Sequence, residues 1–188
     1  VTVGVPLLLT ASNPVSLCAG ISTTLTATAT GGGNPYTYNW MPGIGTNSTF
    51  TVTPTSTTTY TVTVTDNCNA TLTATTTVTV NPLPTVAFNP NDSSGCTPLC
   101  VNFANSSSST TTCQWTFTGG SPASSSSATP NNICYITPGS YNVGLVITDA
   151  NGCSSQLTIN QLITVYPIPV ANFSMSTQTT TIFEPDIC

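Results

Sequence analysis

A strict alternation of apolar and hydroxyl side chains is the feature that most constrains the fold of this chain. Residues 60–65 read YTVTVT and residues 23–30 read TTLTATAT, and the same period of two recurs along the whole sequence. Successive side chains of a β-strand point to opposite faces of a sheet, so this pattern predicts strands with one buried and one solvated face. No stretch favours a helix instead, and we therefore expect an all-β fold.

A short connector occurs three times and divides the chain. It reads VTVGVPLLL at residues 1–9, VTVNPLPTVAF at 78–88 and ITVYPIPVANF at 163–173, with spacings of 77 residues (1 to 78) and 85 residues (78 to 163). In each copy β-branched residues favour a strand, and a proline, which has no amide hydrogen to donate, then ends it. Such a recurrence indicates tandem units.

The connectors set the expected domain boundaries. Short strands separated by turn residues predict β-sandwiches within the units. The remnants at both ends of the sequence cannot form a sandwich alone, because an isolated strand leaves its apolar face and backbone unpaired. We expect a terminal strand at 1–5, which links to or ends a preceding repeat, sandwiches at 6–81 and 82–167, and, at 168–188, the first strands of an incomplete repeat or an inter-subunit strand.

Threonine and serine, rather than charged residues, supply the polar faces of these strands. The 188 residues include 41 Thr and 21 Ser, no Lys, Arg or His, and five acids, at positions 66, 92, 149, 184 and 186. Binding of nucleic acids and of anionic membrane surfaces depends on basic side chains, so the composition excludes both kinds of partner. No apolar run approaches the roughly 20 residues of a membrane-spanning helix.

The same composition leaves little for catalysis. A serine nucleophile needs a general base, and the chain has neither histidine nor lysine to serve as one. Asp66 and Asp149 occupy equivalent hairpin turns, where we expect them to accept local backbone N–H bonds. Calcium ligation by these two aspartates is the alternative; otherwise we expect no metal and no cofactor. We therefore expect a protein that is not an enzyme.

Eight cysteines predict folding in an oxidising compartment. Zinc binding is not expected, because no C-x-x-C spacing occurs and no histidine can complete a zinc site. Five Asn-x-Ser/Thr sequences are candidate N-glycosylation sites, at Asn47, Asn69, Asn91, Asn105 and Asn172. O-linked glycans on the hydroxyl-rich runs 106–112 and 123–127 are favoured over these, since sequons arise by chance in so Thr-rich a chain.

One stretch of the second unit resembles the signature of PKD domains. Residues 135–149 read YITPGSYNVGLVITD, with a Pro138-Gly139 turn followed by alternating apolar residues. Residues 115–120, WTFTGG, match the family's W-D-F-G-D-G motif in part and lack both of its acids. The first unit is similar to related immunoglobulin-like repeats through Tyr38-x-Trp40 and the stretch 60–66, YTVTVTD.

The resemblance implies immunoglobulin-like (PKD-type) β-sandwiches that form tandem repeats in large secreted bacterial surface proteins. It also implies disulfide partners, with Cys113 and Cys188 left over. The implied pairs are Cys18–Cys68, Cys96–Cys153 and Cys100–Cys134.

From these features we expect an extracellular protein at the bacterial cell surface, whose partners are copies of itself or adjacent repeats, joined head to tail, and glycans. The expected function is that of a non-catalytic structural repeat of a surface stalk or filament, with strand complementation between subunits as one way of joining the units. The alternative is an adhesin or carbohydrate-binding accessory module of a larger secreted protein.

Overall fold

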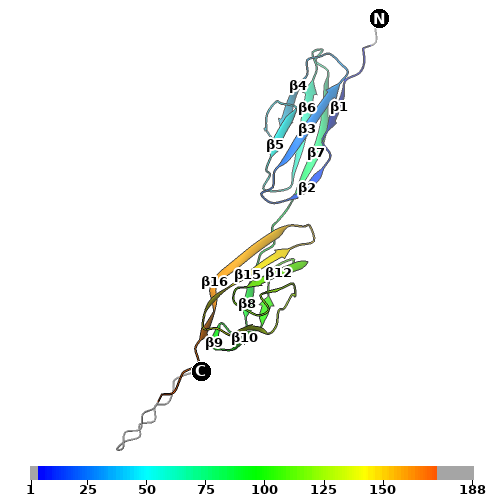
Figure 1. Cartoon of the computed structure of the whole chain (residues 1–188). Coiled ribbons are helices and arrows are strands. Elements are labelled where there is room, and N and C mark those ends of the chain that lie inside the picture. Colours follow the sequence, from blue (N-terminus) through cyan, green and yellow to red (C-terminus); the bar gives the residue numbers. More distant parts are fainter. Residues whose placement is uncertain (1–3, 173–188) are drawn as a thin grey trace, which may run out of the picture. The chain divides into compact units, whose positions relative to one another are not determined.

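A computed structural model describes residues 4–172 of the chain, and these residues form strands, turns and loops only. The all-β prediction is therefore confirmed. The chain divides into two compact units, Val1–Leu83 and Pro84–Cys188, each with its own core (Figure 1). None of the described residues belongs to a helix that is long and apolar enough to cross a membrane.

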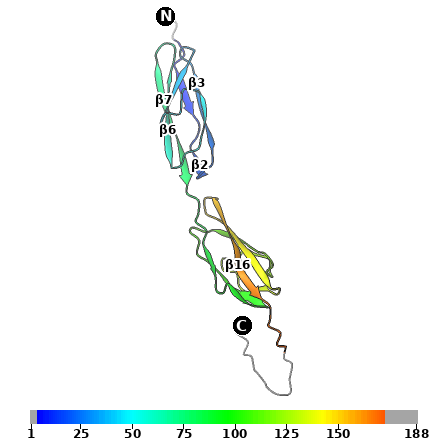
Figure 2. The same cartoon turned by 90° about the vertical axis from the view of Figure 1, so that its left-hand side faces the viewer.

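Unit one is a sandwich of two sheets, which Figure 2 shows as two layers of strands. The first sheet has the order β1 (Leu8–Ala11), β3 (Thr23–Thr30), β5 (Thr49–Val52). The second has the order β2 (Val15–Cys18), β7 (Thr71–Asn81), β6 (Thr58–Thr65), β4 (Thr37–Met41). The chain thus changes sheets between β1 and β2, and β2 runs parallel to β7, with Cys18 opposite Asn81.

The two faces of the unit-one strands differ as the alternation predicts. The inward side chains form a core around Trp40, which is 0% exposed and donates its indole N–H to the carbonyl of Asn47 at 3.0 Å. The outward side chains are mainly threonines. On β6 and β7 they stand directly opposite one another, in the pairs Thr59–Thr77, Thr61–Thr75, Thr63–Thr73 and Thr65–Thr71. Unit one therefore presents an uncharged hydroxyl surface on this sheet.

Unit two is built around a five-stranded sheet. Its order is β13 (Ser124–Ser125), β12 (Thr112–Phe117), β15 (Gly139–Thr148), β16 (Ser154–Tyr166), β9 (Ser94–Cys96), and β9 runs parallel to β16. The remaining strands pair as β8 (Phe88–Pro90) with β11 (Phe103–Asn105) and as β10 (Leu99–Val101) with β14 (Ile133–Tyr135). The core lies between these strands and the sheet.

Trp115 is the centre of the unit-two core. It is 0% exposed, and its ring centroid lies 5.1 Å from that of Phe88, 5.7 Å from that of Phe103 and 5.8 Å from that of Phe117. Its indole N–H donates to the carbonyl of Ser127 at 2.9 Å. The polar edge of the ring is thus satisfied while its apolar surface is removed from water, which is the arrangement a buried tryptophan requires.

The β15–β16 hairpin contains a bulge, where the register shifts between Tyr141 and Val143. Opposite it, Gln161 has a φ of 54°, and its backbone N–H donates to the Asn142 side chain at 2.8 Å. The side-chain carbonyl of Asn142 therefore satisfies an amide that the shifted register would leave without a strand partner.

The strands predicted at the two ends of the sequence lie partly outside the described residues, which exclude 1–3 and 173–188. Gly4 and Val5 lie in no strand, and neither do residues 168–172, which differs from the prediction. The carbonyl of Val5 accepts a single bond from the Gly32 N–H, at 2.8 Å, rather than joining a ladder.

Candidate functional site

The Cys100–Cys134 disulfide cross-links two strands within unit two. The two residues stand directly opposite one another on β10 and β14, and their sulfur atoms are bonded with a Cα–Cα distance of 3.9 Å. This is one of the pairs that the family resemblance implied. The bond closes a loop with a sequence separation of 34, for which the chain-entropy model gives about 4 kcal/mol of stabilisation.

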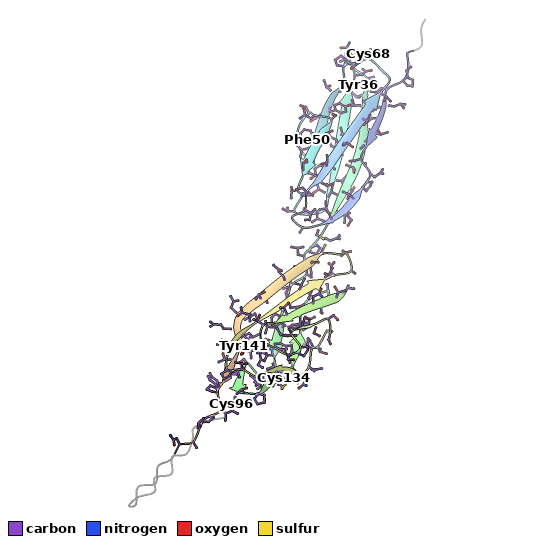
Figure 3. The ribbon with its side chains drawn as sticks, viewed as in Figure 1. Tyr36, Phe50, Cys68, Cys96, Cys134 and Tyr141 are labelled. Atoms are coloured by element: carbon purple, nitrogen blue, oxygen red, sulfur yellow. A yellow bond between two sulfur atoms is a disulfide. The ribbon has the colours of Figure 1, made fainter. Side chains whose placement is uncertain are left out.

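The predicted Cys18–Cys68 disulfide is wrong. Cys68 is a free, exposed thiol in the hairpin before β7, and Figure 3 shows it at one end of unit one. Cys18 lies opposite Asn81, the last residue of β7. The 11 residues of β7 therefore separate the two positions by roughly 35 Å, whereas a disulfide needs Cα atoms within about 7 Å. Cys18 takes part in another disulfide.

The predicted Cys96–Cys153 disulfide is wrong for the same reason. Cys96 pairs with Tyr166 at the end of β16, while Cys153 directly precedes Ser154 at its start. The 13 residues of β16 place these positions roughly 40 Å apart. Both cysteines are disulfide-bonded, but not to one another. In each unit the predicted pairing failed because the strand that carries the cysteine, β2 or β9, runs parallel to the last strand and ends far from the hairpin.

The state of the two thiols that are free among residues 4–172 gives a testable prediction. Cys68 is exposed, whereas Cys113 is buried on β12 and accepts a hydrogen bond from the Asn105 side chain at 3.2 Å. We expect alkylation of the native protein to modify Cys68 rapidly and Cys113 only after unfolding in denaturant. Peptide mapping by mass spectrometry without reduction measures both. Rapid native labelling of Cys113, or protection of Cys68, would contradict the structure.

The Asp66 carboxylate organises one end of unit one. It is 5% exposed and accepts backbone N–H bonds from Gly33 at 2.8 Å, Cys68 at 2.9 Å and Ala70 at 2.8 Å. The close approach requires a glycine at position 32, where φ is 59° and a Cβ would lie 2.4 Å from the carboxylate. The hairpin that follows β6 is thereby fixed to the glycine turn that precedes β4.

Asp149 has the equivalent place in unit two. Its carboxylate accepts the backbone N–H groups of Asn151 at 2.8 Å and Cys153 at 2.9 Å. Both aspartates thus hold hairpin turns, as the sequence predicted. Among residues 4–172 no group of three or more Cys, Asp or Glu side chains is placed to hold a metal ion.

The hydrogen bonds of Asp66 predict an acid-dependent stability. The bond from Gly33, the largest influence, and those from Ala70 and Cys68 together outweigh burial and lower the pKa of Asp66 below its ordinary value. Because the pKa is lower in the folded than in the unfolded state, the carboxylate stabilises unit one above about pH 4, and this contribution is lost as the pH falls through the folded-state pKa.

We therefore expect Asp66→Asn to lower the melting temperature at neutral pH by several degrees, and to differ less from the wild type once the pH has fallen through the folded-state pKa of Asp66. The amide group would place a donor against the Gly33 N–H. Thermal unfolding followed by circular dichroism over this pH range measures the effect, with Asp92→Asn as a control, since exposed Asp92 bonds only the adjacent Asn91 side chain. A difference that is constant with pH would contradict the prediction.

Tyr141 locks the start of β15. Its hydroxyl donates to the carbonyl of Thr137 at 2.6 Å, and its ring stacks on Tyr135 with centroids 4.9 Å apart. Gly119, with a φ of 72°, leaves room for the ring, since a Cβ there would lie 2.3 Å from it. A tyrosine that bonds a backbone carbonyl four residues upstream is typical of immunoglobulin-type sandwiches, where it is called a tyrosine corner. The alternation in residues 135–149 does not predict this hydrogen bond.

Removing the Tyr141 hydroxyl should have a modest, measurable effect. We expect Tyr141→Phe to lower the free energy of unfolding by about 1 kcal/mol, because the Thr137 carbonyl loses its donor while the ring packing remains. Urea unfolding measures this value. Tyr166→Phe is the matched control, because Tyr166 is 52% exposed and we expect no change there. Equal effects of the two variants would count against the corner.

Tyr135 lies beside the corner and has a different environment. It is 0% exposed, and its hydroxyl has no hydrogen-bond partner among the described residues. Burial, with a smaller contribution from Tyr141, raises the pKa of Tyr135 to about 12. The hydroxyl therefore stays neutral at physiological pH and has no means of acting as a base.

The candidate glycosylation sites differ in accessibility. Asn105 is half-buried, and its amide nitrogen is engaged with the Cys113 sulfur, so it is a poor acceptor. Among the hydroxyl runs, Ser107, Ser108 and Ser125 bond backbone amides and hold loops together. The other sequons are exposed and stay candidates: Asn47, Asn69, Asn91 and Asn172.

Comparison with known proteins identifies the family of unit two. Residues 79–165 match the family model described as the PKD domain. A search of curated proteins found no match. Unit two is therefore a PKD/immunoglobulin-like domain, and such domains are generally non-catalytic binding or structural modules. PKD domains and disulfide bonds are both typical of extracellular proteins.

Several solved structures align with most of this chain at low sequence identity. Sidekick-1 immunoglobulin domains 1–4 are 14% identical with a TM-score of 0.44, over 88% of this chain and 50% of that one. A three-domain structure of titin (I67–I69, an E-to-A mutated variant) is 14% identical with a TM-score of 0.46, over 87% and 66%. The fibronectin(III)-like modules of Clostridium thermocellum CbhA are 13% identical with a TM-score of 0.37, over 90% and 100%. The chain thus spans half of the Sidekick-1 structure.

Proposed function

We propose that this chain, with its PKD domain in unit two, is a non-catalytic structural repeat of a stalk or filament on the outer surface of a bacterial cell. The observation that carries the proposal is the outward face of β6 and β7, where opposed threonines form a polar surface without any charged group. Threonine hydroxyl groups keep such a face hydrated without ionisable side chains. This suits an exposed structural surface rather than a reactive one.

Several of the polar groups that could perform chemistry are engaged in holding loops. Asp66 accepts three backbone N–H groups and Asp149 accepts two. The hydroxyls of Tyr36 and Tyr141 donate to the backbone carbonyls of Gly31 and Thr137. These bonds support a structural rather than a catalytic use of the few titratable side chains.

The cross-links and composition also suit exposure outside the cell. The Cys100–Cys134 disulfide and the disulfide bonds of Cys18, Cys96 and Cys153 persist only where thiols are oxidised. The absence of lysine and arginine leaves trypsin-like proteases no cleavage site. Both features support a long-lived extracellular protein.

In this proposal successive units are joined head to tail, either along a longer polypeptide or by β-strand addition between subunits. Sedimentation velocity of the purified chain separates the two. A single monomeric species at all concentrations indicates covalent links, whereas strand addition gives larger species whose proportion grows with concentration.

The surface location is tested with antibodies raised against the purified chain. We expect the antibodies to label intact cells of the source organism, and protease treatment of intact cells with a broad-specificity enzyme to remove the signal. Permeabilised cells are the matched control. Labelling that appears only after permeabilisation would overturn the proposal.

A further inference from the structure

The outer face of the β12–β15–β16 sheet in unit two contains a hollow that neither the fold nor the structural role accounts for. These three strands lie side by side in Figure 1. The hollow has a volume of about 250 Å³. Its lining includes Thr116, Thr118, Asn142, Gly144, Gln156 and Thr158.

Gly144 is the cause of the hollow. It stands between Thr116 on β12 and Thr158 on β16, directly opposite both. A Cβ added at Gly144 would lie 3.3 Å from the Thr158 hydroxyl oxygen and 3.9 Å from the Thr116 Cβ. The floor is therefore backbone, the two threonines form the walls, and a side chain at this position would project into the space. A glycine within a strand commonly marks such a close approach.

The polar groups around the hollow have unused hydrogen-bonding capacity. Asn142 uses its carbonyl to accept the Gln161 N–H at 2.8 Å, which leaves its NH₂ group to donate outward. No hydrogen bond within residues 4–172 engages the side chains of Thr116, Thr118, Gln156 or Thr158. Hydroxyl and amide groups both donate and accept, so this lining matches a ligand that carries closely spaced hydroxyl groups.

The charge and shape of the face decide the class of ligand. None of the lining residues is ionisable, so an ionic ligand would lose hydration without gaining a counter-charge. Protein–protein interfaces usually depend on aromatic or arginine side chains that insert into the partner. The largest exposed apolar side chain in the lining of the hollow is that of Val146, which is 39% exposed. Pockets for drug-sized ligands have volumes of roughly 300–1,000 Å³. The hollow is smaller than this and has room for a single ring-sized group.

We propose that this hollow, centred on Gly144 between Thr116 and Thr158, binds one residue of an uncharged carbohydrate. The hollow has no aromatic side chain on which a sugar ring could stack, so we expect weak binding at a single site. The expected dissociation constant is in the millimolar range, which corresponds to about 4 kcal/mol of binding free energy. Repetition of the site along the proposed stalk would raise the overall affinity by avidity. This last point alone rests on the proposed function; binding by the single chain does not.

The test is a titration of the ¹⁵N-labelled full chain, observed by NMR, with neutral oligosaccharides (cello-, malto- and manno-hexaose) and with oligogalacturonate as an anionic comparison. We expect at least one neutral probe to shift the amide signals of Thr116, Gly144 and Thr158. Oligogalacturonate should leave these signals unchanged. The experiment uses protein in solution, so its result is separate from that of the antibody labelling.

Two variants test whether the sugar binds in this hollow. Gly144→Val places the side chain of a strand-favouring residue in the hollow, and should abolish the shifts. Thr158→Val keeps the shape but removes a hydroxyl, and should weaken binding by about three- to tenfold. Thr158→Val also tests the site if Gly144→Val does not fold. Thr63→Val, on the threonine face of unit one, is the matched control and should bind like the wild type.

Several results would overturn the proposal. These are no shift at the three amides with any neutral probe, equal or stronger binding of oligogalacturonate, or undiminished binding by Gly144→Val. Shifts of the same amides with protein concentration alone, in the absence of sugar, would assign the face to a second copy of the chain and would also overturn it.

Discussion

Replacing Trp115 with alanine is expected to destabilise unit two by about 3–5 kcal/mol, the largest effect of any single substitution considered for this chain. The ring is 0% exposed and packs against Phe88, Phe103 and Phe117. Its removal leaves a cavity among these residues and deprives the Ser127 carbonyl of its donor. A loss of this size is a large part of the stability of a small domain.

Hydrogen exchange followed by mass spectrometry, in increasing urea, measures the loss separately for peptides of each unit. We expect faster exchange in residues 84–172 and none of this change in residues 4–83, because the ring contacts of Trp115 all lie in unit two. Trp115→Phe keeps a ring in the core but loses the bond to Ser127, and should fall between wild type and alanine. Equal destabilisation of both units would contradict the division into separate cores.

Removing the Cys100–Cys134 disulfide is expected to lower the free energy of unfolding of unit two by about 2–4 kcal/mol. The bond joins β10 to β14, a pair of three-residue strands whose ladder contributes little by itself. Without the bond, the unfolded chain regains the freedom of a long loop, and the short strands have less to hold them together.

The double variant Cys100→Ser, Cys134→Ser, compared with the wild type by urea unfolding under non-reducing conditions, measures this loss. Cys68→Ser is the matched control, because this thiol is free and exposed and its replacement should leave the unfolding midpoint unchanged. An unchanged midpoint in the double variant would show that the bond adds nothing to the folded state.

The fold class and much of the core could be predicted from the alternation alone. Tyr60, Val62 and Val64 alternate with threonines in the sequence, and in the structure they are 5%, 0% and 0% exposed. The period of a strand determines which side chains share a face, and this property is local, so a single sequence carries it. Trp40 and Trp115, which are both 0% exposed, were quoted only for the family resemblance, and the structure places them in the two cores.

The disulfide pairing could not be obtained in this way. The alternation is the same for parallel and antiparallel strands, so it does not tell that β2 and β9 run parallel to β7 and β16. That direction moves Cys18 and Cys96 a whole strand length away from the hairpin cysteines. The Cys100–Cys134 pair, which the family resemblance implied, is confirmed, and its two strands are antiparallel and in register.

Contacts between residues that are distant in the sequence could not be predicted either. The turn bonds of Asp66 to Cys68 and Ala70 are local and were expected, but the bond from Gly33 crosses a sequence separation of 33 residues. The hollow depends on the strand register that places Gly144 between two threonines. A lone glycine in a strand can be recognised in the sequence, but only the strand register shows which residues lie opposite it.

The proposed place of the chain in a fibre outside the cell is tested by immunogold electron microscopy of intact cells. With antibodies against the purified chain, we expect gold particles in rows along thin appendages that extend from the cell surface. Gold confined to the cytoplasm of sectioned cells, or spread through the medium with no labelled appendage, would contradict it.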